Sequence, residues 1–298
     1  MIGEELIGEP LLAEPDVTWS AAAGGYNVPP DWLPHCEVIS PERPPVLHVG
    51  RNAPPRTVAE LEFAADLGLE LDIQPQGGLD LHRLAPVLPR LKRLTIGGLQ
   101  PVHGWDALAQ SSLTELWASP SEPLPAIGSL EVLVASGAHS LSGMVSPRLR
   151  RADIDLDGGS WTFDGVVAGP LQELQMQSPR GMDRVPELAQ PQELSTFRVH
   201  RCASLDLSGL ADARNLSWLD LSQVREVRGL SVLRNLTRLQ ELTITGAWIL
   251  TGWEVLFELD IDRIVIRNNR AIPDEGARAL MAHGAGRWHV GLVGEKSS

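Results

Sequence analysis

One short segment of the chain carries acidic side chains at a spacing suited to metal binding. Asp153, Asp155 and Asp157 occupy positions 1, 3 and 5 of a twelve-residue stretch that has Gly158 at position 6 and Asp164 at position 12. Oxygen ligands at this spacing can surround one calcium ion. The last position, however, is usually the longer glutamate, which supplies two oxygens to the metal. The motif is therefore incomplete.

The same acids also fit a β-strand. In the repeat described below, Asp153 and Asp155 occupy outward-facing strand positions, so at least half of the stretch would be extended and not looped. We therefore favour a solvated acidic strand face, and we expect added calcium to leave the melting temperature unchanged. Calcium-dependent binding through Asp153–Asp164 stays open as an alternative. We assign no metal site and no cofactor.

Motifs for other chemistry are absent from the sequence. It contains no G-x-x-x-x-G-K-[ST] phosphate loop, no H-E-x-x-H pair and no G-x-S-x-G nucleophile turn. The string Asp155-x-Asp157-Gly158 resembles the first motif of haloacid-dehalogenase-type phosphatases, which also need a downstream lysine. The only lysine downstream is Lys296, near the end of the sequence. We expect the protein not to be an enzyme.

Composition limits the class of protein. Of 298 residues, 43% are hydrophobic, which is typical of a folded chain, and no window approaches 18 consecutive apolar residues. Glu4 and Glu5 stand where a signal peptide needs positive charge, so we expect a cytoplasmic protein. The net charge of −13 argues against nucleic acid and anionic membranes as partners. Basic charge is almost entirely arginine, which suggests a GC-rich, bacterial genome.

An apolar repeat organises the chain from about residue 44 onward. The pattern L-x-x-L-x-L is clear at Leu91–Ile96 and recurs, with weaker copies at both ends, at steps of 17 to 24 residues. Its period of 2 predicts short strands with apolar side chains inward and polar ones outward. Because one unit cannot bury its apolar edge alone, neighbouring units must stack into a parallel sheet. The twelve units begin at residues 44, 68, 91, 113, 130, 149, 171, 194, 216, 239, 261 and 285.

The segments between strands differ in their helical signals. Thr57–Gly68 has a rough apolar face, and Asp274–His283 opens with acids that suit a helix N-terminus, so both predict helices. In the middle of the chain, the short steps and three prolines predict loops or 3₁₀ turns. Four tryptophans on these segments are expected to pack in the core or on the convex side: Trp105, Trp161, Trp248 and Trp253.

This repeat resembles the leucine-rich-repeat superfamily over roughly residues 44–298. The resemblance implies an α/β solenoid with one parallel sheet of about twelve short strands on its concave face, and with helices and irregular loops on its convex face. The family usually has Asn or Cys at the turn after each strand. Only Cys202 and Asn269 obey this rule here, so we expect no continuous asparagine ladder.

Residues 1–43 precede the repeat and differ from it in composition. They contain eight acids, one arginine and six prolines. This composition is typical of an extended or partly disordered arm. The segment also contains Trp19, Trp32 and other apolar side chains that are costly to leave in water. We favour a cap over the first repeat, and a free partner-binding tail is the alternative.

Outward strand positions are the remaining candidates for function, because they build the face that such solenoids use for binding. Tryptophan at such positions beside arginine and carboxylate has the composition of a protein-binding hot spot. The alternative is that neighbouring repeats cover these side chains. The predicted partner-binding residues are Trp117, Arg151, Asp153, Asp155, Gln175, Arg198, His200, Trp218 and Asp220.

The sequence thus predicts a protein-binding module without catalytic activity. Its partner is expected to be another protein, and the net acidity favours a basic one. An inhibitor or immunity protein that blocks a bacterial toxin fits this description. A structural or adaptor subunit of a larger bacterial assembly is the alternative. We expect the free chain to be monomeric.

Overall fold

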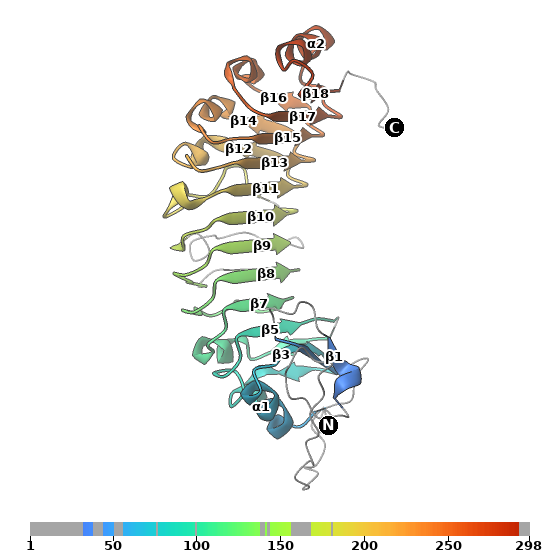
Figure 1. Cartoon of the computed structure of the whole chain (residues 1–298), viewed down its shortest axis with the longest axis vertical. Coiled ribbons are helices and arrows are strands. Elements are labelled where there is room, and N and C mark those ends of the chain that lie inside the picture. The colour runs from blue at the N-terminus through green and yellow to red at the C-terminus, as the bar shows by residue number, and fades with distance from the viewer. Residues whose placement is uncertain are drawn as a thin grey trace. The chain divides into compact units, whose positions relative to one another are not determined.

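The computed structural model describes residues 32–37, 44–50, 56–75, 77–98, 100–137, 141, 144–155, 168–179 and 181–291. The chain divides into two compact units. Figure 1 labels their helices and strands. The first unit comprises residues 1–136 and 143–148, and the second comprises residues 137–142 and 149–298. Each unit is built on a series of hydrogen-bonded, mostly parallel strands that follow one another in chain order.

The first unit contains the early repeats. Its main strands are β1 (Cys36–Glu37), β2 (Val46–Gly50), β3 (Glu70–Gln74), β5 (Arg93–Ile96), β7 (Glu115–Ala118) and β8 (Val132–Ser136). From β2 to β8 all pairs are parallel, whereas β1 is antiparallel to β2. A second, two-stranded parallel sheet joins β4 (Leu79–Asp80) to β6 (Val102–His103).

The local sequence of the segments between these strands agrees with the helices or loops that they form. Helix α1 (Val58–Asp66) begins with a capping box, in which Thr57 and Glu60 each accept a hydrogen bond from the other's backbone N–H. The predicted helix in Thr57–Gly68 is confirmed. The next two segments form only the 3₁₀ helices η4 (Leu81–Leu84) and η5 (Trp105–Gln110). No helix forms between β7 and β8, where Pro120, Pro123 and Pro125 lie, as predicted.

Part of the N-terminal segment packs against the first repeat. The 3₁₀ helix η3 (Leu33–His35) follows Trp32, whose buried ring makes an edge contact with Phe63 of α1 at a centroid distance of 6.0 Å. Strand β1 pairs with the outer edge of β2, which would otherwise expose unpaired backbone groups. Residues 32–37 therefore lie where a cap over the first repeat would lie. Trp19 lies outside the described residues.

The second unit continues the repeat. Its main strands are β9 (Arg151–Asp155), β10 (Glu173–Gln177), β11 (Thr196–His200), β13 (Trp218–Ser222), β15 (Glu241–Thr245), β17 (Arg263–Arg267) and β18 (Trp288–Val290). All consecutive pairs are parallel. A smaller parallel sheet contains β12 (Ser204–Asp206), β14 (Glu226–Arg228) and β16 (Ile249–Leu250). The twelve main strands from β2 to β18 start two or three residues after the predicted repeat positions.

Most return segments of the second unit are 3₁₀ helices. Helix α2 (Asp274–His283) confirms the predicted helix with the same bounds. The others are η7 (Pro191–Glu193), η8 (Leu207–Leu210), η9 (Leu230–Asn235) and η10 (Trp253–Glu258). Repeats of 22 or 23 residues leave a short return path, which a single tight turn of helix can span. No helix within the described residues is long and apolar enough to cross a membrane.

Each strand contributes alternate side chains to the core. Leu219 and Leu221 of β13 are fully buried, as are Leu174 and Met176 of β10. Because the strands pair in register, these side chains stack on their equivalents in the neighbouring repeats. The predicted alternation of inward and outward residues is therefore confirmed in most described strands, but Val46 and Gly50 of β2 and Arg93 of β5 are buried at outward positions. The outward residues form a separate surface.

Candidate functional site

The outward side chains of the second unit form three rows across its strands. The strand register aligns Arg151, Glu173, Thr196, Trp218, Glu241 and Arg263 in the first row. The second row contains Asp153, Gln175, Arg198, Asp220, Thr243 and Val265, and the third contains Asp155, Gln177, His200, Ser222, Thr245 and Arg267. All of these residues are exposed or partly exposed.

Eight of the predicted partner-binding residues lie together in this array. They come from four neighbouring strands, β9, β10, β11 and β13. We call them the β9–β13 patch: Arg151, Asp153, Asp155, Gln175, Arg198, His200, Trp218 and Asp220. The ninth, Trp117, lies on β7 of the first unit, where its side chain is 37% exposed and Arg93 lies 5.2 Å from its ring centroid. The predicted exposure of both tryptophans is confirmed.

Trp218 and Arg198 are the most closely coupled pair of the patch. The guanidinium carbon of Arg198 lies 3.7 Å from the centroid of the Trp218 ring, in the geometry of a cation–π contact. This contact comes from adjacent strands, since Arg198 pairs with Asp220, two residues beyond the tryptophan. The ring nevertheless keeps 36% of its surface exposed. The contact orients an aromatic side chain that stays accessible to a partner.

The Arg198 side chain also has unused hydrogen-bonding capacity. Its Nε is buried and has no hydrogen-bond partner among the described residues. A buried N–H without an acceptor is costly, so an acceptor from outside would stabilise it. Nearby, Asp220 Oδ1 accepts a hydrogen bond of 2.6 Å from the Ser222 hydroxyl. The carboxylate is thereby oriented on the same face.

Charges on the patch are only partly compensated. Arg151 Nε lies 3.5 Å from Glu173 Oε2. Asp153 and Asp155 have no ion pair within 4.0 Å among the described residues. Burial raises the pKa of Asp153, the charges of Arg151 and Arg198 oppose this rise, and the charge of Asp155 adds to it. An approaching cation would therefore stabilise the ionised form of Asp153.

The structure describes two of the acids of the calcium alternative. Asp153 and Asp155 lie on β9 with outward side chains, as the strand interpretation predicted. Asp157 and Asp164 lie outside the described residues. Within the part that the structure describes, no group of three or more His, Cys, Asp or Glu side chains is arranged to hold a metal ion.

Cys202 occupies the buried turn position that was predicted for it. Its Sγ donates to the backbone oxygen of Ser204 at 3.0 Å and approaches that of Met182 at 3.5 Å. Burial raises the pKa of this thiol, so the reactive thiolate is disfavoured. Cys202 therefore contributes to packing.

The four return-segment tryptophans have different environments. Trp105 is fully buried and its Nε1 donates to the backbone oxygen of Val102 at 2.9 Å, so its prediction is confirmed. Trp253 is partly buried beside Phe257. The prediction for Trp248 is wrong, because this side chain is 55% exposed. Trp161 lies outside the described residues.

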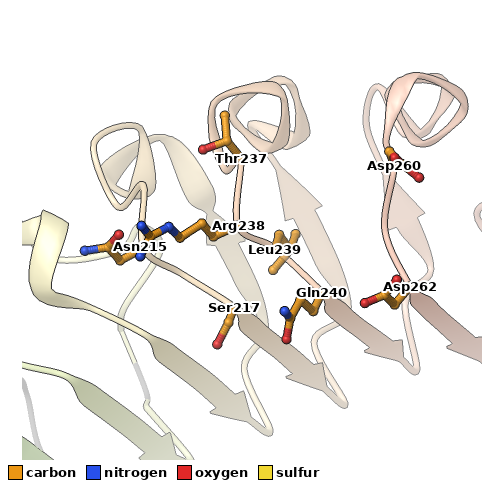
Figure 2. A pocket seen from close by; sticks show the side chains of 8 residues that line it. All are labelled: Asn215, Ser217, Thr237, Arg238, Leu239, Gln240, Asp260 and Asp262. Carbon is orange, nitrogen blue, oxygen red and sulfur yellow. The ribbon is translucent and has the colours of Figure 1, made fainter.

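A polar hollow lies where strands β13, β15 and β17 begin (Figure 2). It has a volume of about 490 Å³. Figure 2 shows the Arg238 side chain extending toward Asn215, whose Nδ2 donates to the backbone oxygen of Gln192 at 2.6 Å. On its other side, Asp260 and Asp262 lie 4.0 and 3.9 Å from the guanidinium of Arg287. Its lining contains no histidine or cysteine, and we assign it no catalytic role.

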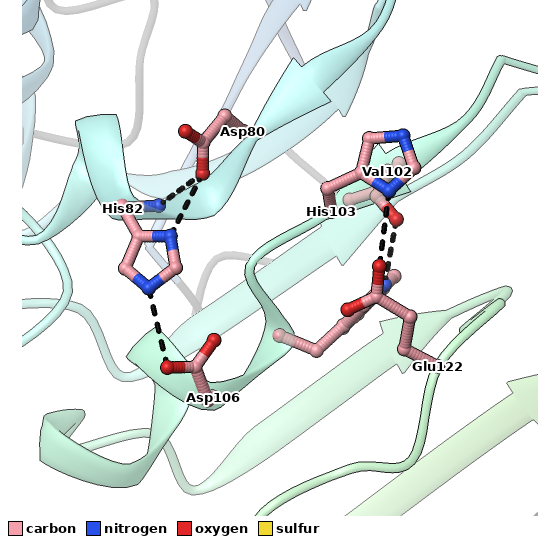
Figure 3. A network of polar contacts seen from close by, with 7 residues as sticks. Asp80, His82, Val102, His103, Asp106 and Glu122 are labelled. Atoms are coloured by element: carbon pink, nitrogen blue, oxygen red, sulfur yellow. Dashed lines mark hydrogen bonds and ion pairs between the residues drawn. The ribbon is translucent and has the colours of Figure 1, made fainter.

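A network of histidines and carboxylates links successive repeats in the first unit (Figure 3). His82 Nδ1 lies 3.0 Å from Asp80 Oδ1, and His82 Nε2 lies 3.2 Å from Asp106 Oδ2 in the next repeat. His103 Nδ1 makes a similar contact of 3.0 Å with Glu122 Oε1. Asp80 also caps η4 by accepting from the backbone N–H of His82. These exposed contacts order the turns between successive repeats.

The chain matches no protein-family model, and no curated protein matches its sequence.

Proposed function

We propose that this chain is a protein-binding module of the leucine-rich-repeat type, and that it binds its partner through the β9–β13 patch without catalysing a reaction. The exposed ring of Trp218, held beneath Arg198, is the observation that carries this proposal. In a leucine-rich-repeat solenoid this face would be the concave one, which such proteins commonly use for binding.

The placement of Trp218 favours binding over a structural role. An outward strand position contributes nothing to the leucine core, and exposed aromatic surface costs free energy in water. Burial of a tryptophan or arginine at an interface typically contributes more than burial of other residue types. The strand ladder and the Arg198 contact also restrict the ring before binding, which lowers the entropy cost of association.

The charge distribution supports a basic partner surface. Arg151 is compensated by Glu173, and Arg198 lies against the Trp218 ring. The carboxylates of Asp153 and Asp155 remain without an ion-pair partner among the described residues. A lysine or arginine of the partner would complement them. An inhibitor of a basic toxin, such as an immunity protein, is the kind of module that this chemistry suits.

Replacing Trp218 by alanine tests the proposal. The partner is first captured with the full-length chain, and its affinity is then measured by calorimetric titration. We expect Trp218→Ala to weaken binding by about 2 kcal/mol, as for a hot-spot residue. Thermal unfolding should change by no more than about 0.5 kcal/mol, because the site is a surface position.

Trp248→Ala is the matched control, because it removes an exposed tryptophan from the same unit outside the patch. It should leave the affinity for this partner unchanged. If Trp218→Ala lowers stability but leaves binding intact, Trp218 is a structural residue and the proposed site is wrong. If only Trp248→Ala weakens binding, the partner docks elsewhere.

A further inference from the structure

A second exposed aromatic surface lies where the parallel strands of the second unit end. Arg225, Trp248 and Arg270 occupy the same position, three residues after the strand, in three successive repeats. The backbone N–H of Trp248 donates to the oxygen of Arg225, and that of Arg270 donates to the oxygen of Ala247, each at 2.8 Å. The hydrogen-bonded turns therefore hold these three side chains in one column.

The two arginines of this column flank its tryptophan. Their guanidinium carbons lie 5.5 Å (Arg225) and 5.4 Å (Arg270) from a Trp248 ring centroid. Trp248 is 55% exposed and its neighbour Ile249 is 52% exposed, the highest values for large hydrophobic residues in the part of the chain that the structure describes. We call this surface the Trp248 edge and define it as Arg201, Arg225, Trp248, Ile249 and Arg270.

The arginines of the Trp248 edge have no acidic partner among the residues that the structure describes. No carboxylate of the described residues lies within 4.0 Å of the guanidinium of Arg201, Arg225 or Arg270. Elsewhere on the same unit, exposed arginines such as Arg151 and Arg234 do pair with glutamates. The edge is thus an uncompensated basic surface on a chain whose net charge is −13. Its charge complements an acidic ligand.

A hollow of about 600 Å³ adjoins the aromatic ring. Its lining combines Met182 and Trp248 with the side chains of Arg201 and Arg225, and all of these residues belong to the second unit. An apolar side chain of a ligand could enter this hollow and cover part of the Trp248 ring. The surface therefore offers apolar and cationic contacts side by side, as peptide-binding surfaces commonly do.

We infer that the Trp248 edge binds an extended acidic segment of another protein, in which two carboxylates three positions apart flank an apolar residue. The distances to the Trp248 ring place the guanidinium carbons of Arg225 and Arg270 no more than about 11 Å apart. A polyproline II segment rises about 3.1 Å per residue with three residues per turn, so side chains three positions apart point the same way about 9 Å apart. Each carboxylate can then form a bidentate pair with one arginine.

The small number of arginines on the edge favours a short acidic peptide over other anions. Nucleic acid and anionic membranes present long arrays of negative charge and bind through many cationic contacts, whereas the edge offers three arginines. A segment of a few residues meets only the arginine column and the exposed apolar side chains. This surface is separate from the β9–β13 patch, so the inference does not depend on the proposed function.

The test measures binding of fluorescein-labelled peptides to the full-length chain by fluorescence anisotropy. The probe is Gly-Ser-Asp-Phe-Leu-Asp-Ser-Gly, and a second peptide carries asparagine in place of both aspartates. We expect saturable binding of the probe that weakens as salt is added. The asparagine peptide should bind at least about tenfold more weakly, because it lacks the charge-assisted pairs. A peptide with adjacent aspartates should also bind more weakly.

Variants of the protein locate the binding surface. The double variant Arg225→Gln/Arg270→Gln and the single variant Trp248→Ala should each lose at least about tenfold in affinity for the probe. Arg278→Gln, which removes an exposed arginine from α2 of the same unit, is the matched control and should bind like the wild type. Circular dichroism melting should show that each variant remains folded.

Several results would overturn the inference. They are no binding of the probe, equal binding of the asparagine peptide, or unchanged binding by the double variant. A single-stranded oligonucleotide or an anionic vesicle that binds more tightly than the probe, and loses this binding in the double variant, would show that the edge binds a polyanion. Self-association of the wild type that the double variant abolishes would identify a second copy of the chain as the occupant.

Discussion

At the level of single residues, every exposed tryptophan of the described chain lies beside an arginine. The pairs are Trp117 with Arg93, Trp218 with Arg198, and Trp248 with Arg225 and Arg270. A guanidinium is planar and more weakly hydrated than an ammonium, so it stacks on an aromatic face more readily than lysine does. The chain contains 25 basic residues, of which only Lys92 and Lys296 are lysines. The high share of arginine among the basic residues thus favours contacts that hold exposed tryptophan rings in place.

A residue-scale prediction concerns the proton equilibrium of His82. Hydrogen bonds with Asp106 and then Asp80 raise the pKa of this imidazole above its ordinary value of 6.5. The charged form is therefore favoured in the folded state, and the resulting stabilisation is present below pH 6.5 and lost as pH rises through the folded pKa. Histidine resonances followed by NMR should show a raised midpoint for His82. Asp106→Asn should lower it.

The matched control for this titration is Glu122→Gln, which removes a carboxylate that contacts His103 and not His82. It should leave the His82 midpoint unchanged. A midpoint at or below 6.5 in the wild type would show that the contacts with Asp80 and Asp106 do not persist in solution.

At the level of elements, the turns after the strands combine a strained backbone with a buried side chain. Arg201, Gln223, Gly246 and Asn268 adopt positive φ in successive repeats, and the next residue points inward each time. Those inward residues are Cys202, Val224, Ala247 and Asn269. Asn269 satisfies three backbone groups, since its Oδ1 accepts from the N–H groups of Ala271 and Ile272 and its Nδ2 donates to the oxygen of Gly291. Cys202 makes only weak thiol contacts with backbone oxygens.

This difference predicts unequal costs of substitution at one structural position. Asn269→Ala should destabilise the chain by about 2 kcal/mol, because it leaves buried backbone groups without partners. Cys202→Ala removes only a weak thiol donor and should cost about 1 kcal/mol. Urea denaturation monitored by circular dichroism measures both. Ala247 is the natural reference for alanine at this position.

Equal losses for the two variants would contradict the prediction. They would mean that the loss of side-chain volume, and not the hydrogen bonds of Asn269, determines the cost. Asn269→Asp provides a second check, since it keeps the Oδ1 acceptor and removes the Nδ2 donor.

At the level of the whole molecule, stability spreads from repeat to repeat. In each unit a strand forms backbone hydrogen bonds only with the strands next to it in the sheet. Backbone hydrogen bonds therefore connect only neighbouring repeats. The stability of such a stack is approximately the sum of terms for each repeat and for each interface between neighbours. A defect in one repeat should therefore weaken nearby strands more than remote ones.

Leu219→Ala, in the fully buried core of β13, tests this expectation. The change should cost about 2–5 kcal/mol, because it leaves a cavity. Native-state hydrogen exchange should lose protection most in β11 and β15, the strands paired with β13, and least in β2 and β3 of the first unit. A uniform loss across both units would show that the chain unfolds as a single cooperative block.

The local sequence was sufficient to predict the twelve main strands, but not β1 or the two smaller sheets, β4–β6 and β12–β14–β16, that the prediction of a single sheet left out. An alternation of period 2 is a property of a few consecutive residues, so it identifies both the strand and the side that faces the core. For this reason β2 to β18 of the main series lie near their predicted positions, and Trp117 and Trp218 point to solvent. Helix α1 was predicted from its apolar face, and helix α2 from the acids in its first turn.

Contacts between repeats decided what local patterns could not predict. The antiparallel pairing of β1 with β2 joins residues from outside the repeat to its first strand. The exposure of Trp248 depends on the positive φ of Gly246, which turns the chain so that Ala247 points inward and the tryptophan points out between two arginines of adjacent repeats. Such positions are set by stacking between residues more than twenty positions apart. Sequence periodicity therefore determined the strands and their faces, whereas packing of neighbouring turns decided which return-segment side chains reach the surface.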